Sequence, residues 1–109
     1  MKLLMGALIL GLVSCGSRNV KNGLSQEEAF PSTFTAIRNR IIVPKCAVCH
    51  EQMLSHKELL KDYVKAGSPE NSGFFTEVEG GGMPLYSDKL LDEEVEAIRL
   101  WIAKGAPLD

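Results

Sequence analysis

Two cysteines and a histidine stand together near the middle of the chain, in the order Cys46-Ala-Val-Cys49-His50. This C-x-x-C-H spacing is the attachment signature of c-type haem. Two sulfurs at this spacing can add to the two vinyl groups on one edge of a porphyrin, and the histidine that follows is then held beside the iron as an axial ligand. The motif therefore predicts one covalently bound haem c, attached through Cys46 and Cys49, with His50 as the proximal iron ligand.

Three other kinds of chemistry use paired cysteines, and the sequence favours each of them less. A redox dithiol of the thioredoxin type belongs near a βαβ pattern, which we do not find. A closed zinc site needs a second pair of ligands, and only His56 and the remote Cys15 remain to supply it. A simple disulfide across so short a loop would stabilise a fold little.

A haem iron also needs a ligand on its second face, for which Met53, His56 and Met83 compete. Met53 follows His50 closely and belongs to the proximal side. The chain from His50 to His56 reaches about 20 Å at most. A segment of this length that passed round the edge of the haem would leave no room for a helix that begins after Ser55. We therefore expect His56 to be a surface histidine.

Met83 follows a long loop, so the chain can return on the far side of the haem. Glycines at 80–82 allow the backbone to approach the macrocycle closely, and Pro84 favours an extended conformation at Met83. We therefore predict Met83 as the distal iron ligand.

The first residues are typical of an exported lipoprotein. Lys2 precedes an apolar run over 3–13, which is too short to cross a bilayer as a helix but suits a secretory signal. Ser14 and Cys15 follow this run, and Cys15 resembles the lipidated first residue of a mature bacterial lipoprotein. Plain export with an incidental cysteine, or an uncleaved anchor, are the alternatives.

This interpretation divides the chain into a signal peptide at 1–14, a flexible tether at 15–31 and one domain at 32–109. We expect a lipid anchor on Cys15, on the periplasmic or cell-surface side of a membrane. Gly16-Ser17, without an aspartate that would retain the protein at the inner membrane, favours the outer membrane.

The composition fits one small globular domain. The chain has 109 residues and a formal net charge of −2, and it has no basic run with interleaved aromatics, so nucleic-acid binding is not expected. Aromatic residues make up 6%, a small supply for the core of such a domain. A cofactor would fill part of that core.

The motif must be positioned by the helices on either side of it. The first predicted helix covers 33–42, where Phe34, Ile37 and Ile41 form one apolar stripe. The residue before a proline is disfavoured in the α conformation, so this helix is expected to end before Pro44.

A second helix is predicted over 56–66. Ser55 and Glu58 form a capping box at its start, and Gly67 ends it. Residues 68–89 are rich in glycine and proline and are expected to be a loop, whose length suggests a functional role.

The last helix is predicted over 93–104, with Asp92 as its N-cap and Gly105 as its end. No segment alternates cleanly between apolar and polar residues as a half-buried strand does. The predicted fold class is therefore all-α.

The segment from Thr33 to Leu108 resembles a small class I cytochrome c domain, and is similar to the short cytochrome domains of planctomycete-type and other bacterial exported proteins. The resemblance depends on features that occur in this order: an N-terminal helix, Cys46-Ala47-Val48-Cys49-His50, a middle helix, Ala66-Gly67-Ser68-Pro69-Glu70-Asn71-Ser72, Gly82-Met83-Pro84, and a final helix with Trp101-Ile102 before Gly105-Ala106-Pro107.

The resemblance implies three main helices wrapped around one covalent haem, with a glycine-rich distal loop. It implies attachment through Cys46 and Cys49 and axial ligation by His50 and Met83. The first and last helices should cross near Phe34, Ile37 and Trp101. Many such domains have a proline soon after the motif whose carbonyl orients the proximal histidine. Residues 51–54 contain none, which leaves the partner of the second ring nitrogen of His50 unassigned.

The expected function is one-electron transfer to and from redox proteins at the membrane surface. A six-coordinate iron has no open position for a substrate, so we do not expect an enzyme. The alternative is a haem-based gas sensor or a peroxide-reactive haem protein in which the sixth ligand is labile.

Overall fold

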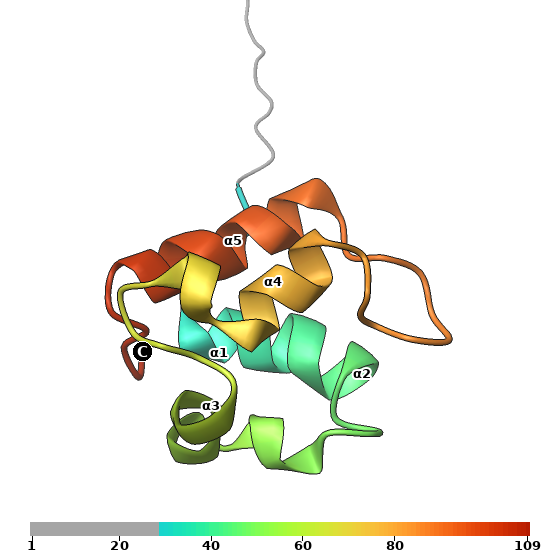
Figure 1. Cartoon of the computed structure of the whole chain (residues 1–109), viewed down its shortest axis with the longest axis horizontal. Coiled ribbons are helices and arrows are strands. Elements are labelled where there is room, and N and C mark those ends of the chain that lie inside the picture. The colour runs from blue at the N-terminus through green and yellow to red at the C-terminus, as the bar shows by residue number, and fades with distance from the viewer. Residues whose placement is uncertain (1–28) are drawn as a thin grey trace, which may run out of the picture.

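The computed structural model describes residues 29–109, and within that range the chain is helical and has no strand (Figure 1). The all-α prediction is confirmed for this part of the chain. The expected signal peptide, Cys15 and most of the expected tether lie outside the described residues. Between Ala29 and Asp109 no helix is long and apolar enough to cross a membrane.

The first helical stretch runs from Phe34 to Lys45, past the proline that was expected to end it. It consists of α1 (Phe34–Ile37), a π-helical turn (Arg38–Ile42) and α2 (Val43–Lys45). The Thr33 side chain accepts a hydrogen bond from the N–H of Ala36 and caps the start.

The predicted end at Pro44 was wrong because the backbone widens just before the proline. The N–H of Val43 donates to the carbonyl of Arg38, five residues earlier, instead of four. Pro44 then stands in the first turn of α2, where its missing N–H costs little. The chain leaves the helix at Cys46.

The second predicted helix begins where expected and ends one turn early. A short 3₁₀ helix (Glu51–Leu54) leads into α3 (His56–Asp62), and the Ser55 hydroxyl accepts the N–H of Glu58 at 3.2 Å. After Tyr63 the backbone forms tertiary contacts instead of a further helical turn. Lys65 donates its N–H to the Ser72 hydroxyl, and Gly67 donates its N–H to the carbonyl of Ile102.

The segment predicted as a loop over 68–89 contains a helix. A 3₁₀ turn (Pro69–Asn71) is followed by α4 (Gly73–Glu79), and only the part beyond Glu79 is irregular up to α5. Phe74 and Val78, one helical turn apart, are both buried. Burial of this short apolar face therefore outweighs the glycine at the start of the helix.

The last helix, α5 (Asp92–Ala103), agrees with the prediction to within one residue at each end. Its N-cap is Leu91 instead of Asp92. The Glu94 carboxylate accepts the Leu91 N–H at 2.8 Å, and the Leu91 carbonyl accepts the Glu94 N–H at 2.9 Å.

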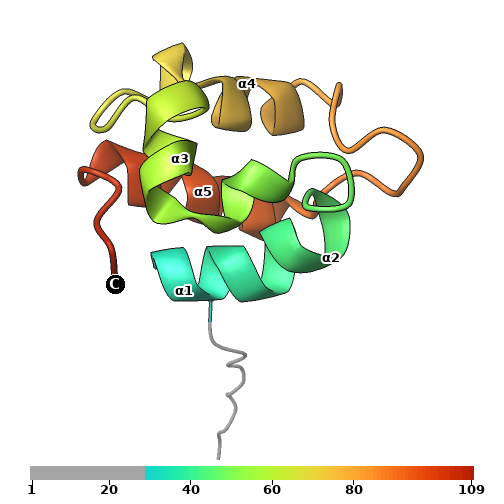
Figure 2. The ribbon, with the colours of Figure 1, turned by 90° about the horizontal axis from the view of Figure 1, so that it is seen from below.

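The core forms where α5 packs against α1 on one side and α4 on the other (Figure 2). The rings of Phe34 and Trp101 lie 6.0 Å apart between their centroids, and Ile37 is fully buried beside them. The expected contact between the first and last helices is therefore confirmed. The largest fully buried side chains are Trp101, Ile37, Ile41, Ile42, Leu59, Ile98 and Ile102.

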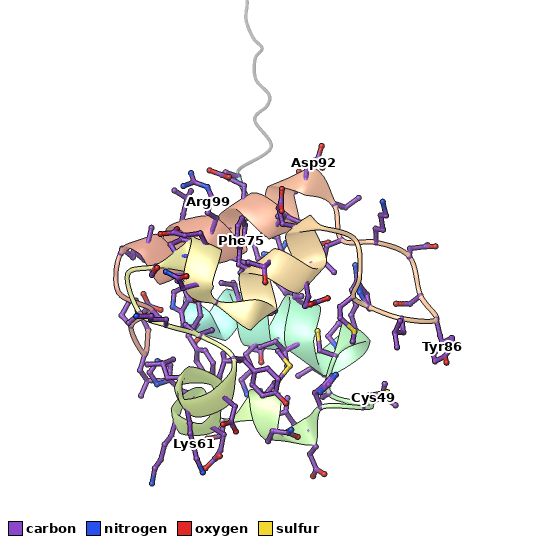
Figure 3. The ribbon with its side chains drawn as sticks, in the orientation of Figure 1. Cys49, Lys61, Phe75, Tyr86, Asp92 and Arg99 are labelled. Carbon is purple, nitrogen blue, oxygen red and sulfur yellow. The ribbon has the colours of Figure 1, made fainter. Side chains whose placement is uncertain are left out.

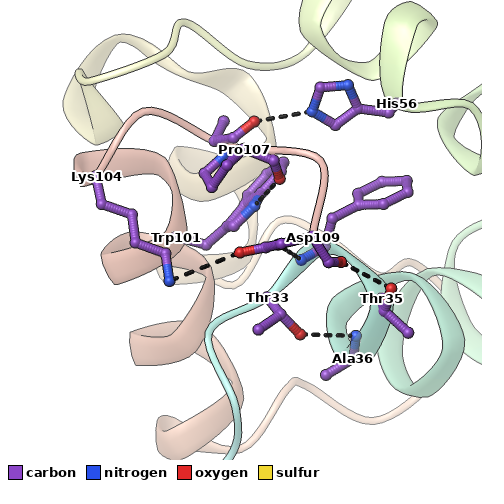
Figure 4. A network of polar contacts seen from close by, with 10 residues as sticks. Thr33, Thr35, Ala36, His56, Trp101, Lys104, Pro107 and Asp109 are labelled. Atoms are coloured by element: carbon purple, nitrogen blue, oxygen red, sulfur yellow. Dashed lines mark hydrogen bonds and ion pairs between the residues drawn. The ribbon is translucent and has the colours of Figure 1, made fainter.

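The residues after α5 return to the start of α1 and bind it through several hydrogen bonds (Figure 4). The Asp109 carboxylate accepts the N–H of Phe34 at 2.8 Å, and the Asp109 backbone oxygen accepts the N–H and the hydroxyl of Thr35. The Trp101 indole N–H donates to the carbonyl of Pro107 at 2.9 Å. The two ends of the domain are thus held side by side.

Candidate functional site

The Cys46-Ala-Val-Cys49-His50 motif lines an open, mostly apolar cavity of about 280 Å³. Pockets for small molecules and cofactors span roughly 300 to 1000 Å³, so this cavity lies near the lower end of that range, and it opens on one side to the solvent. Its walls come from the end of α2, the motif, the end of α3, α4 and the loop that follows α4. The residues that line it include Cys46, Cys49, His50, Met53, Tyr63, Phe74, Val78 and Met83.

Cys46 is placed by the end of the first helical stretch. Its N–H donates to the carbonyl of Ile42 at 2.9 Å, and its side chain is half-buried. Burial raises the pKa of the Cys46 thiol to about 11, although the charge of Lys45 acts in the opposite direction. A thiol with a raised pKa is mostly protonated at neutral pH, unlike the low-pKa nucleophile of Cys-x-x-Cys oxidoreductases.

Cys49 lies on the exposed loop of the motif (Figure 3), where its N–H donates to the carbonyl of Cys46 at 3.2 Å. Both thiols are free, and both line the same cavity. The tight turn between them keeps one cysteine against the domain and the other at the cavity mouth. Both thiols are therefore available to a group that occupies this cavity.

His50 lies directly after this turn and is half-buried. Its N–H donates to the carbonyl of Cys46, and its own carbonyl accepts the N–H of Met53, both at 2.9 Å. The ring has a neighbour that the sequence did not predict. The Tyr63 hydroxyl lies 3.4 Å from Nδ1 of His50, and the two rings meet edge to face at 5.8 Å.

Met83 reaches the same cavity from the loop after α4, so the structure brings together all four predicted haem residues. The Gly82 and Met83 N–H groups both donate to the carbonyl of Glu77, at 2.9 and 3.2 Å. Gly81 has a φ of 84°, a left-handed conformation that favours glycine. The glycines of this loop therefore allow a sharp return of the chain towards the cavity.

The two competing ligands occupy different places. Met53 is buried and lines the cavity on the side of the motif, one 3₁₀ turn after His50. His56 is not the surface histidine that we expected. It is half-buried, with Nε2 2.8 Å from the carbonyl of Ala106 and its ring beside Phe34 and Trp101 (Figure 4). His56 therefore belongs to the packing of the C-terminal segment.

An ion pair connects the residue before the motif to α5. Lys45, the residue before Cys46, lies 3.3 Å from the carboxylate of Glu94 in α5, and the Glu94 residue is buried. The same carboxylate accepts the Leu91 N–H. One side chain therefore fixes the start of α5 and the end of α2 together, which limits movement of Cys46 relative to the core.

The rim of the cavity is apolar and exposed, a feature that fits a haem. Val48 is 90% exposed, and Leu85, from the opposite loop, is 54% exposed. Tyr86, next to Leu85, is fully exposed (Figure 3). Large exposed apolar side chains that gather in one place mark a binding surface. A covalent haem needs two thiols for attachment, and an imidazole and a thioether can be its iron ligands. The cavity offers these groups together with an apolar wall.

Comparison of the chain with protein-family models, with curated proteins and with solved structures finds no match. Within residues 29–109, no three side chains of the His, Cys, Asp and Glu types gather as a group that could hold a metal ion.

Proposed function

We propose that the protein is a membrane-tethered c-type cytochrome that carries one haem c and transfers single electrons. Cys46 and Cys49 would attach the haem, and His50 and Met83 would be its axial ligands. The observation that carries the proposal is the shared cavity, since Met83 lies far along the chain from the motif and yet lines the same apolar space. We also infer that the helical domain is a small cytochrome c-like fold.

The residues around the cavity would act mainly by binding and by excluding water. Each cysteine would add its S–H across one vinyl group, which forms a thioether without any further reactant. Phe74, Val78 and Met53 would surround much of the ring with apolar groups. A haem held in this way supplies a reversible one-electron couple, whose potential depends on the axial ligands and on burial.

Two protein ligands on the iron would leave no position for a substrate, which is why the proposal is a carrier and not an enzyme.

The dithiol alternative is less well supported, because burial raises the pKa of Cys46 instead of lowering it. A methionine ligand also raises the reduction potential relative to a second histidine. The proposed partners are redox proteins that approach the exposed rim around Val48 and Tyr86.

The proposal is tested by the mass of the mature, denatured protein. A peptide that contains Cys46 and Cys49 should keep the mass of one haem with its iron after denaturation, when the protein is produced in a host that matures c-type cytochromes. The variant Cys46→Ala/Cys49→Ala should lose this mass. Haem that extracts from the wild type into acidified organic solvent would contradict covalent attachment.

The membrane tether is a separate part of the proposal, and it depends on Cys15. A lipid anchor there would keep the domain near membrane-bound partners and raise their effective concentration. Labelled palmitate should be incorporated into the wild type and not into Cys15→Ser, and Cys15→Ser should release soluble protein that still holds haem. Equal labelling of both proteins would exclude lipidation at Cys15.

A further inference from the structure

A phenol lies beside the proximal histidine, on the side away from the nitrogen that would bind iron. The hydroxyl of Tyr63 is 3.4 Å from Nδ1 of His50 and accepts a hydrogen bond of 2.6 Å from the side-chain amide of Gln52. Gln52 is the second residue after the motif, and Tyr63 lies at the end of α3. The three side chains therefore form a short polar contact chain at the edge of an otherwise apolar cavity.

The nearby backbone carbonyls already have donors. The carbonyl of His50 accepts the N–H of Met53, and that of Gln52 accepts the N–H of Ser55. The carbonyl of Leu54 accepts Nε–H of the Arg38 guanidinium at 3.0 Å. With no proline in this segment, the phenol is the polar group that the structure offers to Nδ1.

Tyr63 is also held firmly enough to orient another side chain. Its N–H donates to the carbonyl of Leu59 at 2.9 Å, and its carbonyl accepts the N–H of Phe74 at 3.0 Å. Its backbone therefore connects the end of α3 with the start of α4. This position depends on α3 ending at Asp62, because a helix that continued to Ala66 would use the Tyr63 carbonyl internally.

We infer that Tyr63 is the positioning residue of the proximal histidine, and that Gln52 holds its hydroxyl in place. The inference rests on the proposed haem function. For Nε2 to present its lone pair to iron, the proton of the neutral imidazole must be on Nδ1, and the phenol oxygen accepts it. An acceptor on this nitrogen fixes the tautomer and the ring orientation and makes the imidazole a stronger donor to the metal.

The first test is the midpoint reduction potential of the holoprotein. Tyr63→Phe keeps the ring and removes the acceptor, so the imidazole donates less to the iron and the potential should rise. Gln52→Ala should change the potential when Tyr63 is present and should have no effect in Tyr63→Phe, since the two groups act through one hydroxyl. The matched control is Thr76→Val, which removes an exposed hydroxyl from a residue of α4 that does not line the cavity and should leave the potential unchanged.

The second test uses nuclear magnetic resonance of the reduced, diamagnetic holoprotein. The Nδ1–H proton of His50 should show a nuclear Overhauser effect to the ring protons of Tyr63, and Tyr63→Phe should exchange this proton with solvent about fivefold faster. Absence of the Overhauser effect would overturn the inference. So would an unchanged potential in Tyr63→Phe that retains covalent haem. A wild type without covalent haem would instead refute the proposed function.

Discussion

At the scale of single residues, Met83 decides whether the proposed haem has a closed or an open second face. It reaches the cavity on a loop held by the carbonyl of Glu77 and turned by Gly81. A thioether on the iron favours the low-spin state in both redox states and disfavours added ligands. Whether the proposed haem would transfer electrons or bind gases therefore depends on this one side chain.

Met83→Ala is expected to remove the weak sulfur-to-iron absorption band of the oxidised protein. It should also lower the reduction potential and open the iron to carbon monoxide, which wild type should bind slowly or not at all. Visible spectra recorded during a redox titration, with and without carbon monoxide, measure all three effects. Met53→Leu tests the competing ligand and should keep the band, because Met53 lies one turn from His50 on the proximal side.

A wild type that is high-spin and binds carbon monoxide rapidly would contradict this assignment. Gas sensing or peroxide chemistry would then explain the haem better than electron transfer. Loss of the band in Met53→Leu but not in Met83→Ala would keep the haem and exchange the ligand.

The sequence singled out residues that line one cavity, and it did not predict the side chains that surround them. Cys46, Cys49 and His50 could be recognised because covalent attachment dictates their spacing. Tyr63 could not, since its approach to Nδ1 depends on where α3 ends. His56 was expected at the surface, yet the carbonyl of Ala106 and two aromatic rings surround it, and these contacts come from segments distant in sequence.

At the scale of elements, Ser72 is the residue that shapes the turn between α3 and α4. It is 1% exposed, and its hydroxyl accepts the N–H of Lys65 at 2.8 Å. The same hydroxyl lies 2.9 Å from the carbonyl of Ser68, to which it can donate. Ser72 therefore closes the loop that begins at Gly67 and brings Phe74 to the cavity.

Ser72→Ala is expected to lower the free energy of unfolding by about 1 kcal/mol, because it removes the buried hydroxyl that accepts the part-buried N–H of Lys65. Chemical denaturation of the holoprotein, followed by circular dichroism, measures the change. Ser87→Ala is the matched control, since Ser87 is exposed in the loop after α4 and should shift stability by less than about 0.5 kcal/mol. Equal stability of both variants would show that the Ser72 contacts contribute nothing.

Helix ends with local signals were predicted well, and those set by tertiary contacts were not. Ser55 caps α3 as its sequence indicated, and α5 agrees with its apolar pattern. The helix α4 was missed because two buried side chains in seven residues give little periodicity. Pro44 was misinterpreted because the wide turn before it depends on a backbone hydrogen bond, from Val43 to Arg38, that residue types do not reveal.

At the scale of the whole molecule, the cavity borders directly on the hydrophobic core. The core residues Met53, Phe74 and Val78 also line the cavity, so each of them faces the open space on one side. Small domains bury a modest share of their surface on folding and have little stability to spare. A haem in this space would complete the core.

The haem-free variant Cys46→Ala/Cys49→Ala is therefore expected to lack a cooperative thermal transition under conditions in which the holoprotein is folded. A cofactor that binds only the native state adds its binding free energy to stability. Thermal scans by far-ultraviolet circular dichroism compare the two proteins. A transition in the variant near that of the holoprotein would show that residues 29–109 fold without haem.

Asp109 accepts hydrogen bonds from Phe34 and Thr35, so the last residue of the domain lies next to its first helix. A short peptide that joined the two ends would cyclise the backbone without distorting it, because the ends already touch. Such a bond would restrict the unfolded chain far more than the folded one, and so would stabilise the domain by entropy alone. It would also allow new chain ends to be introduced in a loop, which would change the order of the helices along the chain.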